Sequence, residues 1–106
     1  MSFHLSSENI HLVDNHILVG QLKNEEGNLQ ESSIDLDQVL GNEDGHFEWG
    51  GVDFSTSAQN VRYSIEGGGA VPVLRAELQT ADQNWRPADV NLAERIENIN
   101  GRFEFI

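Results

Sequence analysis

The sequence predicts an all-β fold, and three observations lead to this expectation. Apolar and polar residues alternate over residues 16–23 and 72–79, which is the period of a half-buried strand. Turn-forming residues fill the stretches 24–28 and 80–84 directly after these strands, so each strand is expected to open a hairpin. Helical periodicity never extends beyond a turn or two. Many short strands separated by turn signals are typical of an all-β domain.

A second level of organisation is an internal repeat. The stretch GNEDGHFEWG (41–50) matches ENINGRFEFI (97–106) at an offset of 56 residues. The same offset aligns the chain back to residue 17, and further upstream the offset becomes 51 because EGGGA (66–70) is an insertion in the second copy. We therefore expect repeats at about 1–50 and 51–106, related by an approximate twofold axis.

The repeat places the predicted elements at equivalent positions in both copies. Strands are predicted over residues 9–13, 16–23, 29–32, 60–65, 72–79 and 85–88. Asp-Gly and Asn-Gly steps then begin a further turn and strand near the end of each copy. Short helical turns are expected within 35–40 and 91–99.

The alternation also predicts which side chains of the two clearest strands face the core. In the first copy Leu18, Gly20 and Leu22 share one face. In the second copy the inward set is expected to be Leu74, Ala76 and Leu78, with Val73, Arg75, Glu77 and Gln79 outside.

Composition limits the classes of function. The 106 residues fit a single domain, 1–106, and the net charge of −12 argues against nucleic-acid and anionic-membrane partners. The chain has no cysteine, and its N-terminus shows neither a basic region nor a long apolar stretch. From these features we expect a cytoplasmic protein without disulfides.

The two stretches SSIDLDQVLGNEDGHFEWG and ADVNLAERIENINGRFEF closely resemble the twin repeats of cyanovirin-N and its homologues. Each copy also opens with Phe-x-x-x-(small)-x-Asn, at Phe3 to Asn9 and at Phe54 to Asn60. The resemblance implies a lectin for mannose-type glycans, typically α1-2-linked mannose. It also implies two pseudo-symmetric halves, each a three-stranded sheet plus a β-hairpin, formed by about 1–38 with 90–106 and by about 39–89.

The chain departs from the family at the positions of its two disulfides. These positions correspond to Ser7 with Leu22 and to Ala58 with Leu78. Apolar packing is expected to replace the covalent bonds.

The resemblance carries two sugar sites over to this chain, one in each half. The second-half site would comprise Gly41, Asn42, Glu43, Asp44, Val52, Asp53, Thr56, Gln79, Thr80, Ala81, Asp82 and Gln83. The first-half site would comprise Ser2, Leu5, Ser6, Lys23, Asn24, Glu25, Asn98, Ile99 and Asn100. Such polar groups suit sugar hydroxyls, which both donate and accept hydrogen bonds.

The two sites are not equivalent. Gly41 and Ala81 stand where cyanovirin-N has a glutamate and an arginine that clamp the sugar, and Glu97 and Glu25 take the corresponding first-half positions. The second-half site nevertheless keeps the polar residues Asn42, Asp44, Thr80 and Gln83, and it is the favoured one.

The same residues also have purely structural interpretations. Asn42 and Asn98 suit turn backbone, and Gly45 and Gly101 suit positive φ. The aromatic residues Phe47, Trp49, Phe103 and Phe105 are expected in the core, and Trp85 is expected to pack because its repeat partner is Leu29.

Other functions fit the sequence less well than a lectin does. A glycosidase would need paired carboxylates such as Glu43 with Asp44 or Glu25 with Glu97, but nothing marks one as acid and the other as nucleophile. The four histidines are scattered without metal-ligand spacing, so no metal and no cofactor are expected. A protein-interaction module with decayed sugar sites remains the alternative.

The resemblance also bears on assembly. A monomer is expected, and a domain-swapped dimer with its hinge near residues 39–44 is compatible with a fold that exchanges elements between repeats.

Overall fold

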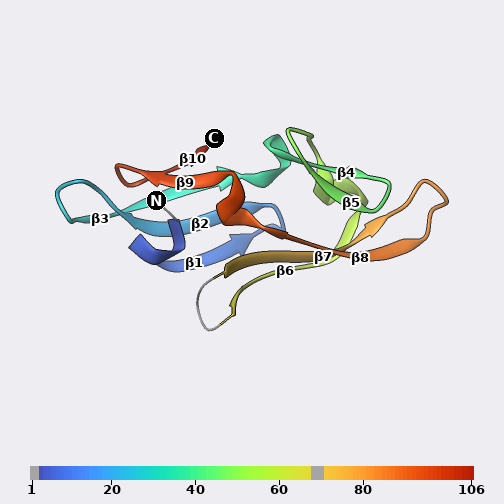
Figure 1. Cartoon of the computed structure of the whole chain (residues 1–106), viewed down its shortest axis with the longest axis horizontal. Helices are drawn as coiled ribbons and strands as arrows, with labels where there is room; N and C mark the ends of the chain where they lie inside the picture. Colours follow the sequence, from blue (N-terminus) through green and yellow to red (C-terminus); the bar gives the residue numbers. More distant parts are fainter. Residues whose placement is uncertain (1–2, 68–70) are drawn as a thin grey trace.

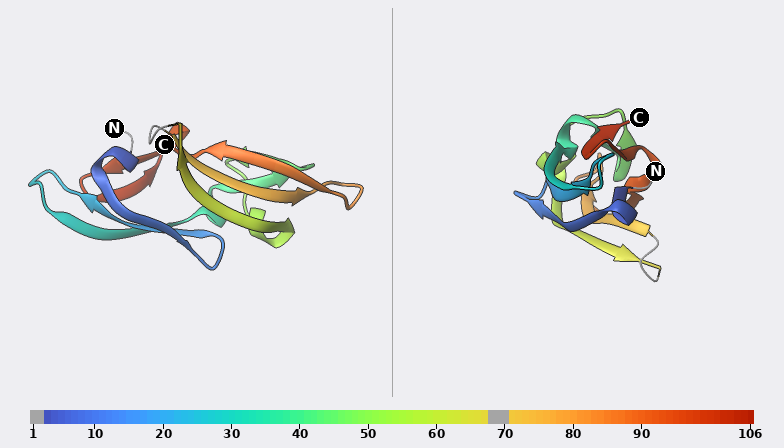
Figure 2. Two further views of the ribbon diagram at one scale, coloured as in Figure 1. Left: turned by 90° about the horizontal axis from the view of Figure 1, so that it is seen from below. Right: turned by 90° about the vertical axis from the view of Figure 1, so that its left-hand side faces the viewer.

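The computed structural model describes residues 3–67 and 71–106 and shows an all-β protein, as the sequence predicts. Within this part of the chain, ten strands form two three-stranded antiparallel sheets and two β-hairpins, joined by four 3-10 turns. The molecule measures 50 × 27 × 21 Å and is elongated along one axis (Figures 1 and 2).

The two sheets have the same topology. The first sheet contains β1 (Ser7–Val13), β2 (Ile17–Lys23) and β3 (Leu29–Asp35), with β2 in the centre. The second sheet contains β6 (Ala58–Glu66), β7 (Val71–Gln79) and β8 (Trp85–Asn91), with β7 in the centre.

Beside each sheet lies a β-hairpin that belongs to the other repeat. The hairpins are β4 (Leu40–Glu43) with β5 (His46–Trp49), and β9 (Ile96–Ile99) with β10 (Arg102–Phe105). Strand β10 contacts β3, and β5 contacts β8. The last hairpin of the chain thus lies beside the first sheet, and the β4–β5 hairpin lies beside the second (Figure 1).

The predicted alternation holds in the two central strands, with one exception. Leu18, Gly20 and Leu22 are buried in β2, and Leu74, Ala76 and Leu78 are buried in β7. The expectation that Val73 faces outward is wrong, because only 7% of its surface is exposed. Val73 lies on the central strand between its cross-strand neighbours Ser64 and Asn91.

The helical segments are shorter than the sequence suggested. Within the stretches 35–40 and 91–99, the 3-10 turns are limited to Leu36–Gln38 (η2) and Leu92–Glu94 (η4), each capped by the side chain of the preceding residue, Asp35 or Asn91. Beyond these single turns the chain pairs as β4 and β9, so the prediction of helix over the rest of 35–40 and 91–99 is wrong. Strand pairing with β5 and β10 outweighs the weak local preference.

Two further 3-10 turns, Phe3–Ser6 (η1) and Phe54–Ser57 (η3), open the two repeats. The sequence did not predict them as helical. Each inserts a fully buried phenylalanine, Phe3 or Phe54, into the core.

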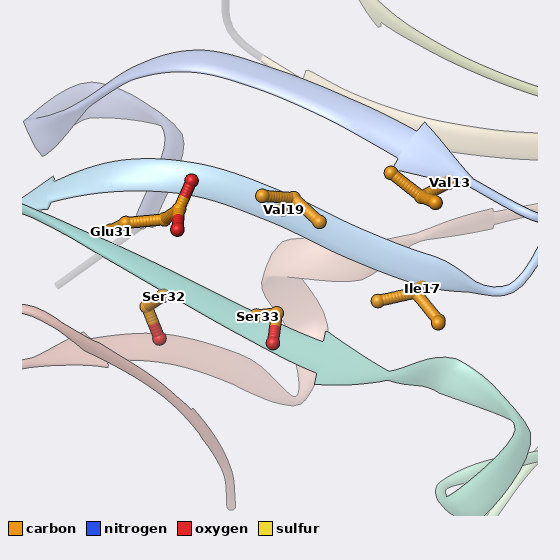
Figure 3. A pocket seen from close by; sticks show the side chains of 6 residues that line it. All are labelled: Val13, Ile17, Val19, Glu31, Ser32 and Ser33. Atoms are coloured by element: carbon orange, nitrogen blue, oxygen red, sulfur yellow. The ribbon is translucent and has the colours of Figure 1, made fainter.

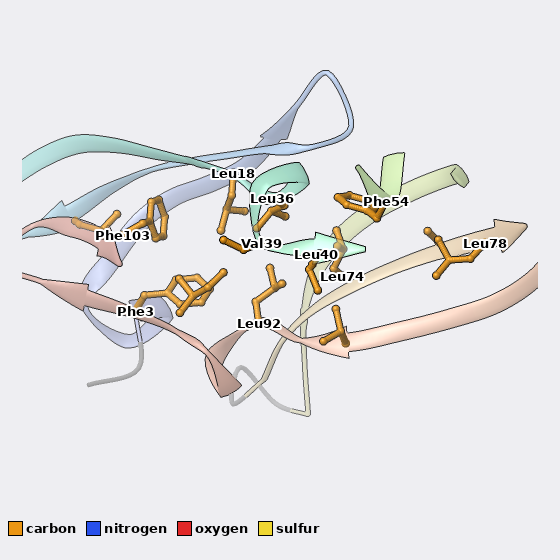
Figure 4. Close-up of a cluster of buried hydrophobic side chains, with 14 residues drawn as sticks. Phe3, Leu18, Leu36, Val39, Leu40, Phe54, Leu74, Leu78, Leu92 and Phe103 are labelled. Atoms are coloured by element: carbon orange, nitrogen blue, oxygen red, sulfur yellow. The ribbon is translucent and has the colours of Figure 1, made fainter. Parts of the chain in front are cut away.

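One continuous apolar core runs through both halves (Figure 4). Phe3 packs edge to face against Phe103, with ring centroids 5.4 Å apart, and Phe54 packs in the same way against Phe47 at 5.6 Å. Leu36, Leu40 and Leu92 are fully buried between these aromatic groups. Residues of both repeats contribute to this core, so the core is shared between the repeats.

Four expected core positions behave differently. Phe47 and Trp49 are only half-buried and pack against the edge of the core, and Phe105 is 37% exposed. The prediction that Trp85 packs is also wrong, since Trp85 is 43% exposed. It begins β8, directly after the β7–β8 turn.

The positions that carry disulfides in the family are paired across strands. Ser7 is the register partner of Leu22, and Ala58 is the register partner of Leu78. Both leucines are fully buried, so apolar packing occupies these positions, and the Ser7 hydroxyl donates to the Phe3 carbonyl oxygen.

Among the described residues, no helix has the length and apolar character required to cross a membrane.

Candidate functional site

Two turns meet at the far end of the second half and enclose an open groove. The β4–β5 turn supplies one wall and the β7–β8 turn the other, and the groove has a volume of about 410 Å³. Its lining residues are Asn42, Glu43, Asp44, Ser57, Gln79, Thr80, Ala81 and Gln83. Seven of these eight belong to the predicted second-half site, so the structure brings most of that set together.

Asn42 connects the two walls of the groove. Its Nδ2 donates to the Gln79 carbonyl oxygen and to the Ser57 hydroxyl, both at 2.8 Å. Its Oδ1 accepts from the Gly45 amide at 2.8 Å, which closes the β4–β5 turn. Asn42 thus has the structural role that its residue type suggests, and it also fixes the spacing of the two turns.

A second bond between the walls comes from Asp44. Its Oδ1 accepts a hydrogen bond from the Ala81 amide at 2.9 Å, and its backbone adopts a φ of 48°. One oxygen of this carboxylate is therefore used in positioning the β7–β8 turn. Glu43, the last residue of β4, is exposed at the mouth of the groove.

The β7–β8 turn is held by hydrogen bonds between its own residues. The Thr80 amide donates to the Asn84 carbonyl at 2.7 Å, and the Asn84 amide donates to the Thr80 hydroxyl at 3.1 Å. Gln83 has a φ of 65°, a left-handed conformation that costs a non-glycine residue about 1 kcal/mol or more. The rigid turn therefore presents the Gln83 side chain from a strained backbone position.

The first half repeats this construction with different side chains. The Asn98 Nδ2 donates to the Lys23 carbonyl at 3.0 Å, and its Oδ1 accepts from the Gly101 amide at 2.8 Å. The Asn100 Oδ1 accepts from the Glu25 amide at 2.9 Å. These three bonds are the counterparts, at an offset of 56, of those made by Asn42 and Asp44.

Some residues predicted for the first-half site are described only in part or lie outside the described residues. Ser2 lies outside the described residues, and only the backbone of Leu5 and Ser6 is described. Ile99 is 44% exposed at the end of β9.

Five residues predicted for the second-half site are not among those that line the groove: Gly41, Val52, Asp53, Thr56 and Asp82. The Thr56 hydroxyl instead donates to the Asp53 carbonyl at 2.9 Å within η3.

Sequence reasoning missed two residues that the structure adds. Ser57 lines the second-half groove, and its repeat equivalent at the offset of 51 is Ser6, a predicted residue of the first-half site. Comparison of the two copies at this offset therefore identifies Ser57. Gln30 donates through Nε2 to the Gly101 carbonyl at 3.0 Å and supports the β9–β10 turn. No local motif marks Gln30, because its role depends on the distant hairpin.

The electrostatics of the second-half groove favour neutral ligands that donate hydrogen bonds. Among its described lining residues, two carry carboxylates and none is a lysine or arginine. The amides, hydroxyls and carboxylates present a mixed set of donors and acceptors around the opening. Anionic ligands would meet repulsion there, whereas sugar hydroxyls would not.

A second hollow, of about 320 Å³, lies over the first sheet and away from both turn pairs (Figure 3). Val13, Ile17 and Val19 give it an apolar floor. None of the predicted site residues lines it. On the second sheet, the position equivalent to Val19 is Arg75, which pairs with Glu66 and Asp89.

Comparisons with known proteins place the chain among proteins of the same architecture. The family profile described as CVNH domain matches residues 3–104. A Neurospora crassa protein described as a cyanovirin-N homolog is 43% identical over 108 residues, covering 98% of this chain and 97% of the relative.

Solved structures agree. The NMR structure of a Gibberella zeae CVNH protein has a TM-score of 0.91 and 51% identity, covering 98% of this chain and 96% of that one. A designed cyanovirin-N homolog lectin has a TM-score of 0.94 and 41% identity, with full coverage of both chains.

Proposed function

The chain belongs to the CVNH (cyanovirin-N homology) family, and from this premise we propose that it is a lectin that binds mannose-type glycans, with α1-2-linked mannose as the preferred unit. Catalysis and cofactors have no part in this proposal. The observation that carries it is the second-half groove, where the Asn42 bridge and the Asp44–Ala81 bond hold two polar turns at a fixed separation.

The groove offers groups that suit vicinal hydroxyls. The carboxylate oxygens of Glu43 and the second oxygen of Asp44 can accept hydrogen bonds from a sugar, while Gln83 offers both an amide donor and an acceptor. Because the turn backbone is already ordered, little conformational entropy is lost when a sugar binds. A disaccharide covering only this open surface should still bind weakly, since small polar ligands gain little free energy per atom.

We assign the stronger site to the second half. Beside the Glu43 and Asp44 carboxylates, its groove keeps the amides and hydroxyls of Asn42, Thr80 and Gln83, whereas the first-half turns carry Glu25 and Glu97 in place of Ala81 and Gly41. The glutamate–arginine clamp of cyanovirin-N is missing in the second half, and packing explains why position 41 holds glycine. A Cβ on Gly41 would lie 3.0 Å from the backbone of Gly51 and Val52, so a side chain there would require this backbone to move.

The test is an NMR titration of the ¹⁵N-labelled chain with α1-2 mannobiose, with maltose as the control disaccharide. We expect saturable amide shifts at 42–44 and 79–83, weaker shifts at 23–25 and 98–100, and none with maltose. The disaccharide should be recovered intact afterwards. A spectrum unchanged at millimolar mannobiose would overturn the mannose proposal, and cleavage of the disaccharide would overturn the lectin assignment.

The missing clamp supports one alternative, a protein-interaction module on the same fold. This alternative predicts no response to any mannoside. A glycan array probed with the fluorescently labelled chain separates the two: binding to oligomannose structures supports the lectin, and a blank array supports the interaction module.

A further inference from the structure

One histidine and two carboxylates from separate parts of the chain meet at the junction of the two halves. His16 ends the β1–β2 turn, Asp35 ends β3, and Asp37 lies in η2. The His16 Nδ1 lies 2.7 Å from Asp35 Oδ1 and 3.5 Å from Asp37 Oδ2. One ligand atom from each residue falls within 4.8 Å of the other two, and all three side chains are partly open to solvent.

The carboxylates are oriented by surrounding hydrogen bonds. The Asp37 Oδ1 accepts from the Ser55 amide at 3.0 Å, and the Ser55 hydroxyl donates to Oδ2 at 2.5 Å. The Asp37 amide donates to Asp35 Oδ1 at 3.0 Å. In metal centres, such outer hydrogen bonds fix the direction of the ligands.

The internal repeat shows that the fold does not require this triad. At the offset of 56, Pro72, Asn91 and Ala93 replace His16, Asp35 and Asp37. The second junction nevertheless forms the same single 3-10 turn, and Asn91 Oδ1 accepts from the Ala93 amide at 2.9 Å as Asp35 accepts from Asp37. The amide side chain of Asn91 is therefore sufficient to cap such a turn. The imidazole of His16 and the carboxylate of Asp37 are not needed for the turn to form.

We propose that His16, Asp35 and Asp37 form a binding site for a divalent transition-metal ion such as Zn²⁺. One imidazole nitrogen and two carboxylate oxygens are a ligand set that Zn²⁺ accepts, with solvent in the fourth position. Tetrahedral bonds of about 2.0–2.2 Å separate ligand atoms by about 3.3–3.6 Å, so modest rotation of the Asp35 side chain away from His16 opens the required space. The net charge of −12 further favours a cation.

The site does not depend on sugar binding, since neither turn of the second-half groove contributes to it. Its occupation would join the β1–β2 turn, η2 and, through Ser55, η3. Protons compete with the metal for His16, because the hydrogen bond to Asp35 and the charges of Asp35, Asp37 and Asp14 raise the pKa of His16 above 6.5. Binding is therefore best measured near pH 8.

The experiment is calorimetric titration of the chelator-treated chain with ZnCl₂, followed by ¹H–¹⁵N spectra with and without Zn²⁺. We expect one ion per chain and amide changes at residues 14–17 and 35–37. Asp35→Asn should weaken binding at least tenfold while the cap persists, because asparagine already serves at position 91. His16→Ala should weaken it similarly, and His46→Ala, which alters an exposed histidine on β5, should not.

Three results would overturn the site. The first is the absence of heat and of spectral change with Zn²⁺. The second is equal affinity in the wild type and Asp35→Asn, which would place the ion elsewhere. The third is Mg²⁺ binding of equal strength that survives His16→Ala, which would show a diffuse carboxylate effect without imidazole coordination.

Discussion

Trp49 and Phe105 stack on each other, with ring centroids 5.9 Å apart and an interplanar angle of 27°. The two residues are counterparts under the 56-residue repeat, and they end β5 and β10 respectively. A residue contacts its own counterpart where a twofold axis passes between them, so this stack marks the pseudo-twofold axis of the molecule. Arg95 covers the Phe105 ring at 4.9 Å, which adds a cation–π contact to the same place.

Asn42→Ala should weaken sugar binding in the second half and lower stability. The substitution removes hydrogen bonds to Gln79, Ser57 and Gly45, and we expect a loss of about 1–3 kcal/mol in the free energy of unfolding. Urea unfolding measures the stability, and the mannobiose titration measures binding.

The repeat supplies the matched control, Asn98→Ala. It should remove shifts at 23–25 and 98–100 while those at 42–44 persist. If both variants affected both regions equally, the two turn pairs would not be independent sites.

Gln83→Gly should raise the free energy of unfolding by up to about 1 kcal/mol, because glycine adopts a φ of 65° without strain. Gly27, the counterpart in the first half, already occupies this conformation at 81°. The same variant should lose mannobiose affinity, since it removes an amide from the groove. The control is Ala81→Gly, which lies in the same turn but has no positive φ and should therefore lower the free energy of unfolding. Guanidinium unfolding of both variants measures the difference.

Replacing Ser7 and Leu22 together by cysteine should form a disulfide under oxidising conditions. The two residues are register partners, and antiparallel partners have Cα separations within the range that a disulfide spans. A closed loop of about 15 residues predicts about 3 kcal/mol of stabilisation relative to the reduced double variant. Unfolding with and without reductant measures it. Failure of the cysteines to couple would show that the strands do not approach in this register.

Acid should weaken the ion pair between Glu66 and Arg75 on the second sheet. Hydrogen bonds from Arg75 and Ser64 lower the pKa of Glu66 from 4.5 to about 2. A carboxyl with a depressed folded-state pKa stabilises the protein above its unfolded pKa and loses that contribution as pH falls through the folded value. The stability gap between wild type and Glu66→Gln should therefore shrink from about pH 5 to pH 2.

The thermodynamic cycle with Arg75→Met checks the cause of that shift. In the Arg75→Met background, Glu66→Gln should have little pH-dependent effect, because the guanidinium that lowers the pKa of Glu66 is gone. An unchanged gap in that background would assign the pH dependence to another group.

Two aromatic substitutions should differ sharply. Phe54→Ala should cost about 3–5 kcal/mol, because Phe54 is fully buried and packs against Phe47. Trp85→Ala should cost less than about 1 kcal/mol, because Trp85 is 43% exposed at the outer end of β8. Thermal and urea unfolding of both variants provide the comparison, and a large cost at Trp85 would mean that it packs against neighbours.

Much of the fold was predictable because its signals are local. The alternation around Leu18 and Leu74 defined the central strands, and the repeat placed Asn42 and Asn98 in equivalent turns. The family resemblance matched Ser7 and Leu22 to the positions of a disulfide, and the structure shows them as register partners.

The features that could not be predicted depend on contacts distant in sequence. Helical preference at 91–99 gave way to pairing between β9 and β10, and Val73 became buried through its place in the centre of a sheet. The Asp37–Ser55 bonds and the support of Gly101 by Gln30 join segments that no spacing rule relates. Within the candidate site, the turn residues followed from the family resemblance, whereas Ser57 required comparison of the two copies.

The 50 Å length of the molecule separates its two turn pairs, which lie toward opposite ends of the long axis (Figure 1). A disaccharide is far too short to bridge them. If both turn pairs bind sugar, each protein molecule connects two separate glycan chains. Mixed with a glycoprotein that carries many glycans, it would then form a cross-linked network that scatters light. Either Asn42→Ala or Asn98→Ala would leave a single functional end, so growth would stop at coated glycoproteins and the solution would stay clear.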